Sequence, residues 1–127
     1  MNFTSSDEKS PFKTHASVVE DRWEFMCEGL FQRSDALKII DDIAKSAEKR
    51  PELKKCLLDF RNAEVSLGIM GEFIIGEYAA KNILGLRIAL IQVPGQINKL
   101  FEDTAYNRGL RISMVETKAQ ALEWLNK

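Results

Sequence analysis

Apolar and polar positions change their spacing repeatedly along the chain from Trp23 to its end. Short runs that are apolar throughout, or that alternate with polar residues, are each followed by a longer run with helical spacing, four times over. Strand-like and helix-like segments in this order predict an α/β domain with a mixed, largely parallel sheet. We predict about five strands and four helices for this domain.

The predicted strands are short and rich in apolar residues. Among them, Trp23, Phe25 and Cys27 alternate with charged residues that include Arg22 and Glu24. This alternation predicts a strand with one buried face and one solvent-facing face, as at the antiparallel side of a mixed sheet. The five predicted strands cover residues 16–19, 23–31, 56–60, 87–93 and 111–115.

Three of the four predicted helices have familiar start or stop signals. Ser34 is expected to cap the first helix, which ends before Pro51. Thr117 and Gln120 have capping-box spacing at the start of the last helix, and Gly109 supplies the left-handed residue that often follows a helix. The third helix is predicted over residues 96–108, and the last begins after Thr117.

The second predicted helix, residues 67–84, is apolar around nearly its whole circumference. A helix of this kind is usually buried on more than one side, whereas the sheet of a small domain covers only one. Three explanations remain open: tight packing on the chain's own sheet, a second subunit or partner protein, or a bound apolar molecule. Gly68, Gly71 and Gly76 would let another backbone or a ligand approach closely.

Ligands of parallel α/β sheets favour the carboxyl ends of the strands. Predicted loops at residues 61–66, 94–95 and 116–117 should gather there. Asp59 and Arg61 could orient a substrate, or they could form a charge pair that faces solvent at the strand end.

Ser66 precedes the second helix and is expected to cap it. A phosphate at this point would be stabilised by the helix dipole, so Ser66 is also the candidate phosphosite. The candidate partner or ligand surface consists of Asp59, Arg61, Glu64, Gly68, Met70, Phe73, Ile74, Tyr78, Pro94 and Gly95.

Composition narrows the function classes. The formal charge is −1, and no basic block is interleaved with aromatic residues, so neither nucleic acid nor an anionic membrane is expected as a partner. Cys27 and Cys56 are expected to be reduced, buried thiols, and one histidine, His15, is too few for a metal site or a catalytic triad. No nucleotide-binding motif, and hence no cofactor, is predicted. We expect a cytoplasmic protein with a flexible extension at residues 1–15 and one domain at residues 16–127.

Several segments resemble bacterial SpoIIAA-like proteins of the STAS superfamily, which unites sulfate transporters and anti-sigma-factor antagonists. The similar segments are the strand at residues 57–61 with the following Ser66 and Gly68, the stretch at residues 107–117, and residues 121–125. The resemblance implies a mixed sheet with packed helices and a protein without enzymatic activity. It also implies a partner that is a kinase-like or sigma-regulating protein, with a phosphorylated serine at the start of the second helix.

Three functions follow from these observations. The first is a regulatory or scaffold module that acts by binding protein, in the manner of an anti-sigma-factor antagonist, or by self-association. The alternative is a carrier of a small apolar or lipid-like ligand held near the second helix. An enzyme that uses Asp59, Arg61 and Glu64 ranks last, because the sequence offers no nucleophile activated by a base.

Overall fold

A five-stranded sheet forms the centre of the computed structural model, which describes residues 10–94 and 99–127. The strands lie in the order β1-β2-β3-β4-β5, with β1 antiparallel to β2 and all other neighbours parallel. Within the described residues the mixed, largely parallel sheet with four helices is confirmed. The elements are β1 (Lys13–Val19), β2 (Arg22–Phe31), α1 (Arg33–Lys49), β3 (Lys55–Val65), α2 (Gly68–Asn82), β4 (Arg87–Ile91), α3 (Lys99–Asn107), β5 (Arg111–Val115) and α4 (Lys118–Leu125).

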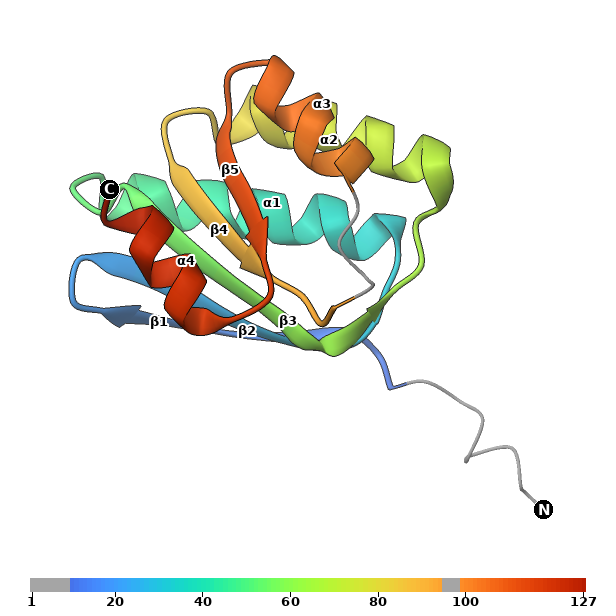
Figure 1. The fold of residues 1–127 in the computed structure, drawn as a ribbon, viewed down its shortest axis with the longest axis horizontal. Helices are drawn as coiled ribbons and strands as arrows, with labels where there is room; N and C mark the ends of the chain where they lie inside the picture. The colour runs from blue at the N-terminus through green and yellow to red at the C-terminus, as the bar shows by residue number, and fades with distance from the viewer. Residues whose placement is uncertain (1–9, 95–98) are drawn as a thin grey trace.

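The helices cover the two faces of the sheet unequally. Helices α1, α2 and α3 pack on one face, and α4 alone packs on the other (Figure 1). The larger core includes the buried residues of α1, at the positions that the helical spacing of the sequence predicts: Ala36, Ile39, Ile40 and Ile43. The smaller core lies under α4, where Leu57, Ala89 and Ile91 meet Ala121 and Leu125. None of the described helices is long and apolar enough to cross a membrane.

Strand β3 is longer than its apolar run predicts. The predicted loop at residues 61–66 is wrong, because the strand continues through Arg61 to Val65 and pairs with the second half of β2. The pairing register shifts between Met26 and Glu28, where the ladder is irregular. Gly29 follows with φ +94°, and a Cβ at this position would collide with the Pro11 carbonyl group.

The first strand begins before the predicted domain start at Ala16. Lys13, Thr14 and His15 pair with β2, so these residues belong to the domain and not to an extension. The Phe12 ring lies 4.7 Å from the ring of Phe31, which adds it to the larger core. The rest of the predicted extension, residues 1–9, lies outside the described residues.

The predicted solvent-facing side of β2 is partly buried. Arg22 and Glu24 are each 7% exposed, and Lys118 of α4 reaches the Glu24 carboxylate at 3.5 Å. The Arg22 guanidinium pairs with Glu24 at 2.7 Å, which satisfies both buried charges. The expectation that these two side chains face water is therefore wrong.

Three of the predicted helix signals are confirmed and one is wrong; α1 ends at Lys49, before Pro51 as predicted. The Thr117 side chain accepts a hydrogen bond from the Gln120 amide at 3.1 Å, and Gly109 has φ +99° after α3. Helix α1, however, begins at Arg33, with Gln32 as its N-cap residue in place of Ser34. The Gln32 amide donates to the Asp35 carboxylate at 2.9 Å, which is the half of a capping box that the N3 side chain supplies. The start of the third predicted helix lies outside the described residues.

Candidate functional site

The first half of α2 exposes apolar side chains to solvent. Ile69 and Met70 are 75% and 65% exposed, and Phe73 and Ile74 are also exposed. We call these four residues the α2 apolar face. An apolar group of this kind on a small domain often marks an interaction site. The sheet and the neighbouring helices thus cover one side of α2 and leave this face open.

Helix α2 packs closely on α3 along a side that borders the α2 apolar face. Gly76 is the residue that allows this approach, because a Cβ at this position would lie 2.9 Å from Cβ of Thr104 and 3.2 Å from the Phe101 carbonyl oxygen. Gly71 would meet only side chains, and a Cβ at Gly68 would meet nothing within 4 Å. Of the three glycines in the predicted second helix, Gly76 therefore serves helix packing.

The second half of α2 is held to its neighbours by polar contacts. The Tyr78 hydroxyl donates to the Asp41 carboxylate of α1 at 2.7 Å, and this hydrogen bond raises the pKa of Tyr78. The guanidinium of Arg108, just after α3, pairs with Glu77 and lies 5.8 Å from the centre of the Phe73 ring. Tyr78 is half-buried in this arrangement, so it differs from the open residues of the α2 apolar face.

Ser66 is exposed but does not cap α2. Its amide donates to the Phe31 carbonyl oxygen at 2.9 Å, and the N-cap position belongs to Leu67, without a side-chain cap. The helix begins at Gly68, whose φ of +73° turns the chain between strand and helix. The capping prediction is therefore wrong, because the chain needs one more residue to leave β3. Ser66 remains exposed beside the α2 apolar face.

Asp59 and Arg61 form the predicted ion pair, but not at a strand end. Arg61 Nε and Nη2 donate to the two Asp59 carboxylate oxygens at 2.9 and 2.7 Å, and this pairing lowers the pKa of Asp59. Asp59 is buried in the middle of β3, so the prediction of a solvent-facing pair is wrong for the carboxylate. Asp59 lies two residues after Leu57, and side chains two residues apart on a strand point to the same face of the sheet. Because Leu57 faces α4, Asp59 also lies on the α4 face, on the other side of the sheet from α2.

The remaining candidates lie in separate places. Glu64 is exposed on β3, opposite Leu30 of β2, and lines a hollow together with Glu28 and Asn62. Pro94 is exposed after β4, and Gly95 lies outside the described residues. The candidate surface predicted from the sequence is therefore not one continuous surface in the structure. Ser66, Gly68 and the α2 apolar face lie together, whereas Asp59, Arg61 and Glu64 do not join them.

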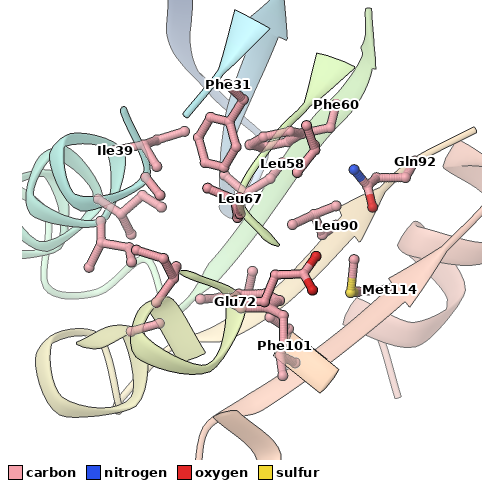
Figure 2. A pocket seen from close by; sticks show the side chains of 18 of the residues that line it. Phe31, Ile39, Leu58, Phe60, Leu67, Glu72, Leu90, Gln92, Phe101 and Met114 are labelled. Carbon is pink, nitrogen blue, oxygen red and sulfur yellow. The ribbon is translucent and has the colours of Figure 1, made fainter. Parts of the chain in front are cut away.

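A cavity of about 60 Å³ lies between α2 and the sheet (Figure 2). Every described residue that lines it is apolar except Glu72 and Gln92, which are 8% and 4% exposed. No hydrogen-bond or ion-pair partner of either side chain is found in the described parts of the chain. Burial raises the pKa of Glu72. The apolar walls include Phe31, Leu58, Phe60, Leu90, Phe101 and Met114.

Sequence reasoning missed both polar residues of this cavity. Glu72 interrupts an otherwise apolar helix, which was a usable signal for a buried acid. Gln92 follows the apolar run of β4 and carries no comparable signal. The cavity nevertheless lies where the parallel topology predicts a site, because Val65, Gln92 and Met114 come from the carboxyl ends of β3, β4 and β5.

The two cysteines are poor nucleophiles. Cys27 and Cys56 are unbridged and buried, which confirms the prediction of reduced, buried thiols. Burial raises the pKa of Cys27 to about 12 and raises that of Cys56 as well, so both sulfurs stay protonated near neutral pH. Across residues 10–94 and 99–127, no three acidic, histidine or cysteine side chains are grouped so that they could hold a metal ion.

Solved structures show which fold this is. An uncharacterised protein of the DUF3478 family from Shewanella loihica PV-4, described as having a SpoIIAA-like fold, matches with a TM-score of 0.56 and 17% identity. The match covers 90% of this chain and 93% of that one. The Bacillus cell fate determinant SpoIIAA, in its phosphorylated form, matches with a TM-score of 0.51 and 11% identity over 87% of this chain and 97% of that one.

These likenesses define a SpoIIAA-like fold, which confirms the resemblance seen in the sequence at the level of fold. No protein-family model matches the sequence, and a search of curated proteins finds no match. The site and the function therefore have to be argued from the residues of this chain.

Proposed function

We propose that this protein is a STAS-type regulatory or scaffold module without enzymatic activity, and that it acts by binding another protein through the α2 apolar face. The observation that carries the proposal is the exposure of Ile69, Met70, Phe73 and Ile74 on one helix of a SpoIIAA-like fold. Each side chain of this size contributes about 1.5–3 kcal/mol when it is fully buried. Ile69 and Met70, which are 75% and 65% exposed, have most of this contribution still to gain, and Phe73 and Ile74, each 37% exposed, have a smaller part.

The chemistry of the described residues supports a binding role over catalysis. The thiols are buried and protonated, as their raised pKa values indicate. His15 is exposed on β1, at the edge of the sheet, far along the strand order from β5. Asp59 is buried, and both of its carboxylate oxygens accept hydrogen bonds from Arg61. A partner with the matching apolar surface is expected, either a kinase-like or sigma-regulating protein or a second copy of the chain.

Ser66 offers a way to regulate this binding. It is exposed and lies three residues before Ile69, the first member of the α2 apolar face. A phosphate there would add about 1.5–2 negative charges at neutral pH, and burying these charges under an apolar partner would be costly. The SpoIIAA structure that this fold resembles is itself of a phosphorylated protein. We therefore include Ser66 in the proposal as the phosphosite that releases the partner.

The expected result for Met70→Glu is loss of the complex with an intact fold. The side chain is 65% exposed, so a carboxylate stays hydrated in the free protein but loses its water when a partner covers it. We expect affinity to fall at least tenfold, which corresponds to about 1.4 kcal/mol. The measurement is recovery of partners with tagged protein from its native cells, with quantitative mass spectrometry and phosphate mapping at Ser66.

Leu84→Glu is the matched control, because Leu84 is also an exposed apolar residue but lies beyond the end of α2. It should leave the complex unchanged. If Met70→Glu binds the same proteins as the control, with both variants folded by circular dichroism, then the α2 apolar face is not the binding surface.

A second candidate function, a carrier of a small apolar ligand, is supported by the cavity under α2. Its walls are apolar on all sides but for Glu72 and Gln92, and it lies at the carboxyl ends of the parallel strands. Native mass spectrometry of freshly purified protein should then show added mass of a small molecule. The same mass as the polypeptide, under conditions that preserve weak complexes, would speak against this function.

A further inference from the structure

Two polar side chains line one end of the cavity without a hydrogen-bond partner among the described residues. Glu72 of α2 and Gln92, just after β4, line the same space and are turned into it, beside Leu90 and Met114 (Figure 2). Both side chains are more than nine-tenths buried, and the described chain supplies neither with a partner. Among residues 10–94 and 99–127, only Trp23 Nε1 is a fully buried side-chain polar atom without a partner, so the polar atoms of Glu72 and Gln92 are not sealed off and stay open to whatever enters the cavity.

The unpartnered carboxylate is the costly member of the pair. An ionised glutamate only accepts hydrogen bonds, and an apolar surrounding gives it nothing to accept from. Its raised pKa, caused by burial, agrees with this lack of a partner. The guanidinium of Arg33, at the start of α1, lies 3.9 Å from the position of a Cβ on Gly71, yet it forms no ion pair with Glu72. The described residues therefore leave the place of a donor to Glu72 open for a ligand.

Gln92 limits which kind of ligand could donate a hydrogen bond to Glu72. Gln92 offers a carbonyl oxygen as a further acceptor. A primary ammonium has three N–H donors, so it could bond both the Glu72 carboxylate and the Gln92 oxygen and would also neutralise the buried charge. The walls of Leu58, Phe60, Leu90 and Phe101 suit an alkyl chain.

The size of the space limits the group that fits. A cavity needs roughly 10–15 Å³ to hold a single water, so 60 Å³ leaves room for a small organic group but not for a long chain. A butylammonium ion has the required size, and a longer amine would have to leave its tail outside.

We propose that this cavity is a binding site for a small primary alkylamine, with its ammonium held by Glu72 and Gln92 and its alkyl chain held by the apolar walls. The inference rests on the second candidate function, since it assigns a ligand class to the same cavity. It is independent of the α2 apolar face, because Glu72 points inward from the helix whose other side carries that face.

The experiment compares n-butylamine with n-butanol, which matches it in length and lacks the charge. Both are titrated at neutral pH into the full-length protein, with amide chemical shifts followed by NMR. Butylammonium should shift amides around Glu72, Gln92 and Phe101 and should bind at least tenfold more tightly than butanol. Glu72→Gln keeps the shape of the side chain and should weaken butylammonium at least tenfold while leaving butanol unchanged.

Two further variants keep the result interpretable. Glu77→Gln removes a carboxylate from the same helix outside the cavity and should bind like wild type. Gln92→Leu removes the second acceptor and should weaken the amine severalfold even if Glu72→Gln were to fold poorly.

The possible outcomes distinguish a wrong ligand class from a wrong carrier function. If butanol binds as well as butylammonium, or if Glu72→Gln and Gln92→Leu leave the amine affinity unchanged, the head-group assignment is wrong while the cavity remains a ligand site. If neither compound binds at millimolar concentration, the carrier function fails together with the inference.

Discussion

Glu24→Ala is expected to destabilise the protein by about 3–5 kcal/mol, because it removes the partner of a buried arginine. Arg22 and Glu24 are each 7% exposed and their charged groups lie 2.7 Å apart. Without Glu24, Arg22 keeps only the exposed Glu20 carboxylate at 3.4 Å among the described residues, and Lys118 also loses its contact. Chemical denaturation at neutral pH measures this loss as a lower free energy of unfolding.

The chain contains a matched control for this prediction. Arg50 and Glu52 have the same spacing in sequence and the same 2.7 Å distance between Nε and a carboxylate oxygen, but both side chains are largely exposed. Glu52→Ala should therefore change stability much less than Glu24→Ala, because water replaces the lost partner. Equal effects of the two substitutions would mean that burial does not determine the contribution of the Arg22 pair.

A double variant tests the cause of the expected loss. Arg22→Met together with Glu24→Leu removes both charges and keeps the volume, so it should recover most of the stability lost in Glu24→Ala. If it stays as unstable as Glu24→Ala, then lost packing and not an unpaired charge explains the effect.

Gly76→Val is expected to destabilise the protein by about 3 kcal/mol, because it forces α2 away from α3. The Cβ would lie 2.9 Å from Cβ of Thr104, and the Phe101 carbonyl oxygen, a backbone atom, lies only 3.2 Å away. A β-branched side chain adds bulk at the same point and lowers helix propensity. The expected fall in melting temperature is roughly 10 °C for a domain of this size, measurable by circular dichroism.

The control for Gly76 is Gly85, which follows α2 and where an added Cβ would meet nothing within 4 Å beyond its chain neighbours. Gly85→Val should leave the melting temperature nearly unchanged. Because α2 also forms one wall of the cavity, Gly76→Val should in addition weaken binding of n-butylamine. A Gly76→Val protein as stable as wild type would show that α2 and α3 are not tightly packed.

The order of the elements could be predicted from local patterns. The stripe Ala36, Ile39, Ile40 and Ile43 has helical spacing, and the β4 run at residues 88–91 has the unbroken apolar character of a central parallel strand. Thr117 caps α4 by contacts with residues three positions away, so its role is visible in sequence. Such features depend on neighbours along the chain, which is why periodicity and capping signals identify them.

Other features were predicted wrongly because they depend on distant partners. Residues 61–64 are mostly polar and look like a loop, yet the second half of β2 pairs with them and extends β3. Arg22 and Glu24 look solvent-facing in an alternating strand, yet both are buried, and Lys118 from the other end of the chain reaches the Glu24 carboxylate. Ser66 looks like a cap, yet the chain reaches helical geometry only after Gly68.

The candidate site also combines a feature that the sequence indicated with features that depend on the fold. The excess of apolar residues in α2 left three explanations open, and the fold shows that Ile69 and Met70 stay largely exposed. Which charged residues accompany that face was decided by the fold, since β-strand parity places Asp59 on the opposite side of the sheet.

The sequence by itself therefore determined the fold class, the order of strands and helices, and the presence of one helix too apolar for the sheet alone. Only the tertiary structure decided which polar groups are buried together, and so created the Arg22–Glu24 pair and the cavity that Glu72 and Gln92 share. The physical reason is that hydrophobic periodicity reports burial of one element at a time, whereas the pairing of buried polar groups depends on how separate elements meet.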